Sequence, residues 1–493
     1  MSSGTAVLTP RETTEPVPSR APRRFRPLPA WLRWTIVIGA GLLVLAAPAP
    51  AGIERQSWHL FAIFVSTMLG LIVQPLPGGA MVLLGVTATT IFGVLPPATA
   101  LAGYADPVVW LVLAAFMIAR GMIKSRLGRR IALLFVRYLG RTSLGLGYSL
   151  ALTDGVLGSV IPSSSARAGG IIFPLAKSIA ESYDSRPGPT ATRLGAFLLP
   201  LLYQTDVIVC AIFITGQASN PLIANFAQQV TGVEITYTRW LAGSIVPGLV
   251  SLAVIPLILY RIFPPLVRRT PDATEFASRE LAAMGKLSRS EAFMLATFLL
   301  VFFLWLTPRW HGIDYAVVAL LGLGGLLLSG VLDWHDVATE RAAWDVFIWY
   351  GGLVALARAL SESGITRWFA DSTAGMLGGW PWPAALLVLV LVYFYAHYGF
   401  ASITAHVSSM YIPFLTVAIA AGAPQLLAVV ALMYFSNLCA SLTHYGTTPA
   451  PIFFGADYIS QGKWWHIGFI VSVLHIITWA VLGALWWKAL GWW

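Results

Sequence analysis

The sequence predicts an all-α polytopic membrane protein with an internal repeat. Hydrophobic residues make up 57% of the chain and charged residues only 11%, which is too little polar surface for a soluble protein of 493 residues. Apolar stretches of about 20 residues, the length that crosses a bilayer, recur from residue 31 to the C-terminus. We therefore expect about 11 transmembrane helices plus two re-entrant helical hairpins in an inverted repeat.

The positive net charge of +10 indicates topology rather than nucleic-acid binding. Basic residues gather at the ends of the apolar stretches, in the N-terminal segment and in the loops 124–141 and 263–290. This pattern is typical of cytoplasmic loops under the positive-inside rule, and of contacts with lipid headgroups. We expect a multi-pass protein of a bacterial inner (plasma) membrane with a cytoplasmic N-terminus and membrane lipids, not nucleic acid, as partners.

The first half of the chain is predicted at residues 31–262. Residues 1–30 precede it and are rich in Pro, Arg and Thr, which predicts a disordered cytoplasmic tail. An even number of early crossings returns the chain to the basic loop 124–141. The predicted elements are spans at about 33–50, 58–75, 80–95 and 108–123, a re-entrant hairpin at about 144–176, a broken helix at about 194–227 and a span at 240–262.

Two apolar segments in this half are interrupted by polar residues, and these interruptions predict a hairpin and a broken helix. Ile-Pro-Ser-Ser-Ser breaks the apolar segment 144–176 at its middle, and basic residues flank both of its ends. A hairpin that enters and leaves on one side explains this better than a single kinked span. Gly216 and Pro221, with polar residues between them, interrupt the next segment and predict a helix in two halves.

The second half, residues 291–493, repeats this plan after a cytoplasmic linker at 263–290. Three crossings separate the linker from the second hairpin, so the two hairpins should enter from opposite faces. The predicted elements are spans at about 291–308, 314–332 and 343–361, a re-entrant hairpin at about 382–415, a broken helix at about 425–455 and a final span at 465–487.

An ungapped alignment relates the two hairpins at an offset of 239 residues, the separation of Ser163 from Ser402. The same register extends back to Asp106, which aligns with Asp345. Polar breaks at equivalent points of two apolar halves are typical of a transporter binding site. The aligned pairs are Ser163 with Ser402, Ser165 with Thr404, Ala166 with Ala405, Arg167 with His406, Pro174 with Pro413 and Trp110 with Trp349.

The breaks predict a site for an anion with two carboxylates. Half-helix ends offer unpaired N–H groups and a positive dipole end, and hydroxyl groups add further donors. The alternative is that the hydroxyls only satisfy backbone carbonyls within the membrane. The predicted substrate-binding residues are Ser163, Ser164, Ser165, Ser402, Thr404, His406, Thr447, Thr448 and Pro449.

A second set could contact either the substrate or a cation. Arg167 and His406 hold matched positions after the two breaks, where each could attract an anion or bind the backbone of its own hairpin. His444 could equally make a helix-end hydrogen bond. The members of this second set are Arg167, Gly216, Ser219, Asn220, Pro221 and His444.

We find no sequence motif of an enzyme. There is no His-Glu-x-x-His, Gly-x-Ser-x-Gly or phosphate-binding loop, and no Cys/His spacing typical of a metal site. The two cysteines, Cys210 and Cys439, lie in apolar segments and suit the core better than a disulfide. Because there is no nucleotide site, uphill transport would need an ion gradient or exchange.

At these residues the chain resembles the divalent anion:sodium symporters (DASS). Pro-Ser-Ser-Ser-Ala-Arg and Ala-Ser-Ile-Thr-Ala-His resemble the family's two tip motifs. Leu-Gly-Arg-Arg-Ile-Ala (127–132), the stretch 437–451 and Gly-Lys-Trp-Trp (462–465) resemble the branch of 2-oxoglutarate/malate translocators and citrate:succinate antiporters. The resemblance implies eleven spans, a homodimer and an elevator mechanism, in which one domain moves against a fixed scaffold.

Two departures from the family pattern bear on coupling. Both motif asparagines are missing, since Ser164 stands at the first position and Ile403 at the second. In sodium-coupled members these asparagines help to hold sodium, so their loss favours exchange and no cofactor. We expect a secondary transporter that exchanges malate, 2-oxoglutarate, succinate or citrate. The alternatives are a sodium- or proton-coupled dicarboxylate symporter and, more distantly, an anion channel.

Overall fold

The computed structural model describes residues 28–374 and 379–493. The predicted tail lies outside the described residues except for 28–30. Within the described ranges the chain is helical and forms no β-strand, and ten of its helices are long and apolar enough to cross a membrane. Three shorter apolar helices accompany them. The predicted all-α membrane class is confirmed.

The helices of the first half follow one another in short steps. They are α1 (Ala30–Ala46), α2 (Arg55–Val73), α3 (Gly78–Ile91), α4 (Pro97–Leu101), α5 (Pro107–Lys124), α6 (Leu127–Leu139), α7 (Ser143–Gly158), the π-helix η2 (Ser165–Ile172), α8 (Phe173–Ser182), α9 (Gly195–Ile212), α10 (Ser219–Thr231) and α11 (Tyr237–Ile262). The chain leaves helical geometry between α7 and η2 and again between α9 and α10.

The predicted linker contains a helix of its own, α12 (Pro271–Met284). The helices after it are α13 (Arg289–Leu306), α14 (Pro308–His311), α15 (Tyr315–Leu328), α16 (Trp334–Thr339), α17 (Arg341–Glu362), α18 (Ile365–Ala374), α19 (Trp382–Ala396), α20 (Ile403–Ala420), α21 (Gln425–Leu438), α22 (Ala450–Phe454), α23 (Gln461–Ile477) and α24 (Ala484–Ala489). Interruptions separate α19 from α20 and α21 from α22.

Local sequence fixes where several helices begin. The Asp106 carboxylate accepts the N–H of Val108 at 3.0 Å, and Pro107 occupies the first helical position, where its missing N–H costs nothing. Ser288 and Glu291 form a reciprocal capping box at the start of α13. These caps place the helix starts at the ends of the apolar stretches.

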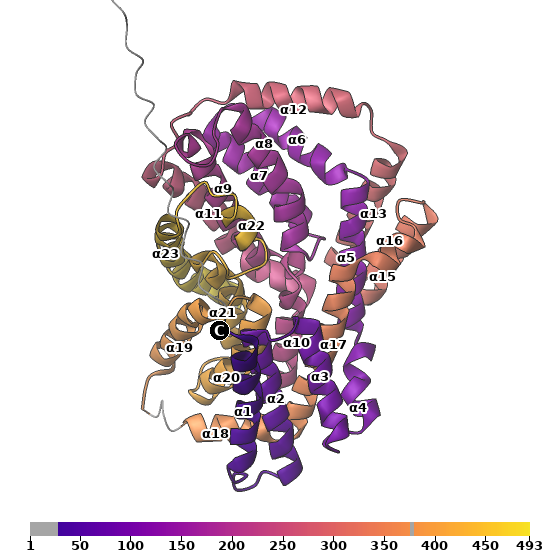
Figure 1. Cartoon of the computed structure of the whole chain (residues 1–493), viewed down its shortest axis with the longest axis vertical. Helices are drawn as coiled ribbons and strands as arrows, with labels where there is room; N and C mark the ends of the chain where they lie inside the picture. Colours follow the sequence, from indigo (N-terminus) through magenta and orange to yellow (C-terminus); the bar gives the residue numbers. More distant parts are fainter. Residues whose placement is uncertain (1–27, 375–378) are drawn as a thin grey trace, which may run out of the picture.

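The two interrupted hairpins approach the centre of the molecule from opposite ends. Figure 1 shows α7 and α8 in the upper part, α19 and α20 in the lower part, and α10 and α21 between them. The helix α10 packs against both α20 and α21, and α9 packs against both α7 and α21. This arrangement agrees with the predicted inverted repeat, in which the two hairpins enter from opposite faces.

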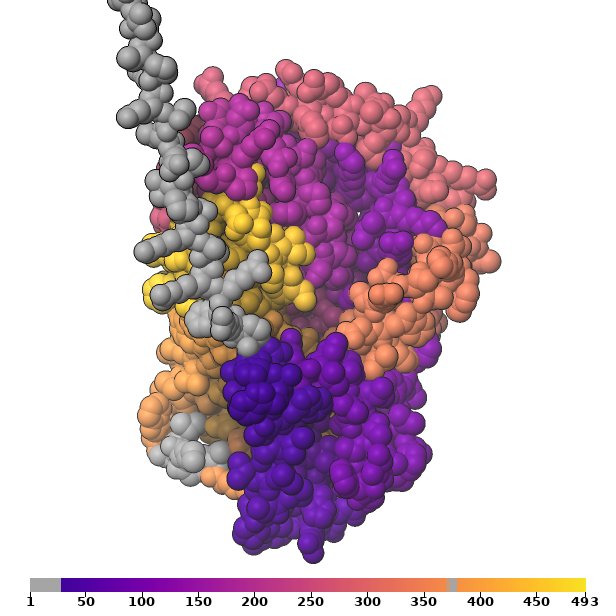
Figure 2. Space-filling view, in the orientation of Figure 1, coloured from indigo at the N-terminus to yellow at the C-terminus, as the bar shows by residue number. Residues whose placement is uncertain are grey.

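The helices form two packing groups. The support helices, α2, α3, α5, α15 and α17, pack on one another, and the hairpin helices, α7–α11 and α19–α23, pack on one another. In the space-filling view the surface is hollowed at mid-height, where the magenta and yellow hairpin segments meet the indigo and orange segments (Figure 2). The candidate site lies between these groups.

Gly468 allows α23 to pack directly on the backbone of the second broken helix. A Cβ at Gly468 would lie 2.5 Å from the carbonyl oxygen of Ser441 and 2.7 Å from that of Leu442. Both oxygens belong to the 3-10 turn η7 (Cys439–Leu442), which ends the first half of that broken helix. A side chain at this position would push α23 away from the turn.

We predict that Gly468→Ala destabilises the protein by about 1–3 kcal/mol, the usual cost of overpacking. The matched control is Gly462→Ala on the same helix, where a Cβ would meet nothing within 4 Å. Thermal unfolding of both purified variants checks this. Equal melting temperatures for the two variants would contradict the close approach.

Candidate functional site

A cavity of about 340 Å³ separates the support helices from the hairpin helices. Its size is within the range of small-molecule sites. The support side contributes residues of α2, α5 and α17, among them Gln74, Phe116 and Trp349. The predicted site residues that line the cavity are Ser163, Ser164, Ser165, Ser219, Ser402, Thr404, Thr447 and Thr448.

Equivalent serines cap the two helices that follow the hairpin tips. The Ser163 hydroxyl accepts the N–H of Ala166 at 3.2 Å, and the Ser402 hydroxyl accepts the N–H of Ala405 at 3.4 Å. Both donors stand three residues after their caps. The first turn of each helix leaves further N–H groups without intrahelical partners, and its dipole end is positive. Two positive helix ends therefore meet at this cavity.

Two hydroxyls at the tips have no hydrogen-bond partner within the described residues. Within the described residues, the side chains of Ser164 and Thr404 have no hydrogen-bond partner, and both line the cavity. Ser165 differs, since its hydroxyl donates to Thr448 Oγ1 at 2.5 Å and so joins the first tip to the second broken helix. The hydroxyls of Ser164 and Thr404 are thus unpaired, and those of Ser163 and Ser402, which only accept a backbone N–H, keep their hydrogens to donate.

Arg167 does not line the cavity. It is fully buried, and its Nη1 donates to the carbonyl oxygens of Ile161 at 2.7 Å and Gly216 at 2.6 Å. Its Nε and Nη2 donate to the carboxylates of Asp154 and Asp206. The guanidinium therefore joins the first tip to the first broken helix, and these partners occupy it.

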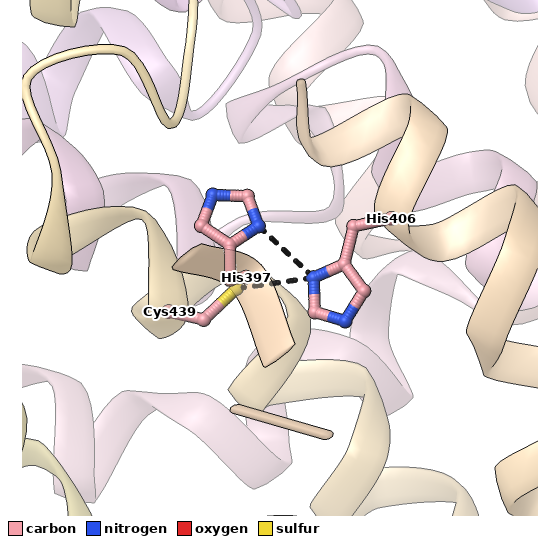
Figure 3. A group of neighbouring side chains, drawn as sticks. All are labelled: His397, His406 and Cys439. Carbon is pink, nitrogen blue, oxygen red and sulfur yellow. Dashed lines mark hydrogen bonds between the residues drawn. The ribbon is translucent and has the colours of Figure 1, made fainter. Parts of the chain in front are cut away.

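His406 does not line the cavity either, and its ring lies beside His397 and Cys439 (Figure 3). Its Nδ1 is 3.0 Å from Nδ1 of His397 and 3.6 Å from Sγ of Cys439. The other ring nitrogen of His397, Nε2, lies 3.0 Å from the carbonyl oxygen of Gly446. Because a carbonyl only accepts, His397 donates there, so His406 donates to its Nδ1. The histidine pair thus joins the second tip to the second broken helix.

His397, His406 and Cys439 each place one nitrogen or sulfur atom that could bind a metal ion within 4.8 Å of the others. The hydrogen bond between the two rings accounts for that spacing. The thiol of Cys439 also has its own acceptor, the Ser436 carbonyl oxygen at 3.2 Å. Hydrogen bonds of two histidine rings thus support the second tip, whereas those of the Arg167 guanidinium support the first.

The remaining candidates of the first broken helix serve its backbone. The Asn220 amide donates to the carbonyl oxygen of Cys210 at 2.7 Å and to that of Phe213 at 2.9 Å, which also accepts the N–H of Gly216. Gly216 accepts from Arg167, and Pro221 lines a different cavity. None of Asn220, Gly216 and Pro221 lines the site.

Two candidates of the second broken helix also lie outside the lining. The ring of His444 accepts a hydrogen bond from the indole N–H of Trp465 at 3.0 Å. Pro449 stands immediately before α22, where it starts that helix. The hydroxyls of Thr447 and Thr448 are the contribution of this break to the cavity.

Sequence reasoning missed several lining residues. Gln217 lies in the first break and donates to Asn437, while Gln74 and Asp345 belong to the support helices. The alignments of Asp345 with Asp106 and of Trp349 with Trp110 were the signals for the support side. Asp345 is the only charged side chain that lines the cavity in the described ranges, so an anion would depend on hydroxyls and helix ends.

A second cavity of about 430 Å³ lies on the other side of the first break. Asp106, Glu234 and Asp314 line it, and its one basic residue, Arg358, is paired with Asp106 at 3.1 Å. This acidic lining would repel an anion. The cavity between the tips is therefore the candidate anion site.

The family model described as "Sodium:sulfate symporter transmembrane region" matches residues 29–493. The chain belongs to the divalent anion:sodium symporter (DASS) family. A similar fold is found in the crystal structure of the YdaH transporter of Alcanivorax borkumensis; the match covers 94% of this chain and 97% of that one, with a TM-score of 0.53 and 16% identity. At that identity the likeness concerns the fold alone.

Three relatives are similar over most of their length. "Putative malate transporter YflS" of Bacillus subtilis (strain 168) is 48% identical over 93% of this chain and 96% of its own. "Dicarboxylate transporter 1, chloroplastic" of Arabidopsis thaliana is 44% identical over 92% and 82%. "L-tartrate/succinate antiporter" of Escherichia coli (strain K12) is 30% identical over 94% and 99%.

We predict that Thr404→Ala weakens the binding of malate, used as the probe, roughly tenfold or more. A hydrogen bond to a charged group contributes about 1.5–3 kcal/mol, and this hydroxyl has no other partner in the described residues. The matched control is Thr416→Ala on the same helix, whose hydroxyl donates to the Ile412 carbonyl at 2.8 Å. Affinity is measured by scintillation proximity on purified protein. Unchanged affinity in Thr404→Ala would remove this residue from the site.

Proposed function

We propose that the protein is a secondary transporter that exchanges di- and tricarboxylates, such as malate, 2-oxoglutarate, succinate and citrate, across a bacterial inner membrane. The observation that carries this proposal is the cavity where two capped helix ends and the free hydroxyls of Ser164 and Thr404 meet. Two positive ends suit an anion with a carboxylate at each end. The names of the relatives, which include a dicarboxylate transporter and a tartrate/succinate antiporter, support the same substrate class.

The surroundings of the tips favour exchange over sodium symport. Transporters of this kind hold sodium with unwound backbone carbonyls. Here Arg167 takes the carbonyls of Ile161 and Gly216, and His397 takes that of Gly446. The apolar side chain of Ile403 adds no oxygen ligand at the second tip. These residues do not fit a sodium ion, so we propose transport without sodium or another cofactor.

We further propose that the hairpin helices move against the support helices in an elevator-like motion. The cavity lies between these two groups, so such a motion would carry the bound anion with the tips. The DASS resemblance adds a homodimer, with the support helices as the fixed part. The mass of the purified protein in detergent, measured by light scattering, checks the dimer.

We expect radiolabelled malate to enter proteoliposomes only when they contain unlabelled malate or 2-oxoglutarate. An inward sodium gradient should leave this uptake unchanged, because the exchange cycle needs a bound anion and no bound sodium. Vesicles without protein and vesicles with sodium replaced by choline serve as controls. Sodium-driven uptake into empty vesicles would instead establish a symporter and refute the exchange proposal.

A further inference from the structure

Three charged side chains are enclosed beneath the first tip. Asp154 of α7 is 1% exposed, Arg167 of η2 is 0% exposed and Asp206 of α9 is 1% exposed. Arg167 Nε donates to Asp154 Oδ1 at 2.9 Å, and its Nη2 donates to Asp206 Oδ1 at 3.1 Å. None of the three side chains lines the anion cavity.

The charges of this cluster do not balance if both carboxyl groups are ionised. An arginine in a protein keeps its proton. Arg167 is the only basic residue that pairs with either carboxylate among the described residues. One guanidinium and two carboxylates would leave a net charge of about −1 in a sealed apolar interior, which is costly. A further positive charge is therefore required.

The hydrogen bonds of the cluster also lack a donor. The second oxygens of Asp154 and Asp206, both Oδ2, are buried and have no partner among the described residues. Both carboxyl groups bind the same edge of the guanidinium, Asp154 at Nε and Asp206 at Nη2, which brings them close together. A proton on one carboxyl group would convert an unpaired acceptor into a donor to the other, and buried polar groups are normally satisfied in this way.

The neighbouring polar groups cannot supply the missing donor. The thiol of Cys210, 3.6 Å from Arg167 Nη2, donates to the Gly216 carbonyl oxygen at 3.4 Å. The phenol of Tyr203 on the same helix donates to the Ala440 carbonyl oxygen at 2.6 Å. Both hydrogens are thus used elsewhere, and neither group adds a positive charge.

We propose that Asp154 and Asp206 form a proton-binding site that holds one shared proton. The proton makes the cluster neutral, and burial away from the cavity retains it. If the hairpin helices move as the proposed function requires, they then carry no unbalanced charge from this cluster through the membrane. Only that consequence rests on the proposed function; the bound proton does not depend on the substrate.

Infrared spectroscopy of the purified full chain at neutral pH tests the site. A protonated carboxyl group absorbs apart from an ionised one, and we expect its band in the wild-type protein. Asp154→Asn and Asp206→Asn should each abolish the band, because one remaining carboxylate balances Arg167. Asp457→Asn is the control that keeps it, since Asp457 is exposed and its positive φ of 58° suits asparagine.

Absence of the band from the wild-type protein would overturn the proposal even if both variants fail to fold. Its survival in both variants would do the same. A second measurement is the pH dependence of unfolding. The folded protein keeps a proton that the unfolded chain releases above the ordinary pKa of a carboxyl group. In that range, each unit of rising pH should therefore lower the folding equilibrium constant about tenfold more in wild type than in Asp154→Asn. Equal pH dependence of unfolding in the two proteins would also contradict a bound proton. Stabilisation of the wild-type fold by sodium with no dependence on pH would do the same.

Discussion

The interrupted helices constrain the rest of this structure, because backbone groups inside a membrane need partners within the protein. Each interruption exposes carbonyl oxygens that a continuous helix would have used. At the first broken helix the Asn220 amide takes the carbonyl oxygen of Cys210, and Arg167 takes that of Gly216. At the second, His397 takes the carbonyl of Gly446. These side chains permit the open turns from which the cavity is built.

The two halves satisfy this constraint with different chemistry around a common geometry. Ser163 and Ser402 cap equivalent helices with equivalent bonds, so the tips present their N–H groups in the same way. Behind the first tip lie Arg167 and its two carboxyl partners, whereas behind the second lies a pair of hydrogen-bonded rings that includes His406. The basic residues therefore support the tips, and hydroxyls and helix ends remain to bind an anion.

Most of what could be predicted from the sequence came from the internal repeat. Polar breaks in apolar segments marked the interruptions, and all of the hydroxyl-bearing residues chosen from them line the cavity. Contacts made across helices left no such pattern. Asp154 and Asp206 are isolated acids in apolar stretches, and only the packing of α7 on α9 brings both to Arg167. The alignment paired Arg167 with His406 but could not show that both face away from the cavity.

The central claim is that an anion binds between the two tips. The most direct measurement is an electron cryo-microscopy structure of the protein with malate. The account predicts malate between Ser164 and Thr404, with one carboxylate at each capped helix end. Malate in the acidic cavity beside Asp106 and Arg358, or an empty space between the tips at saturating malate, would contradict it.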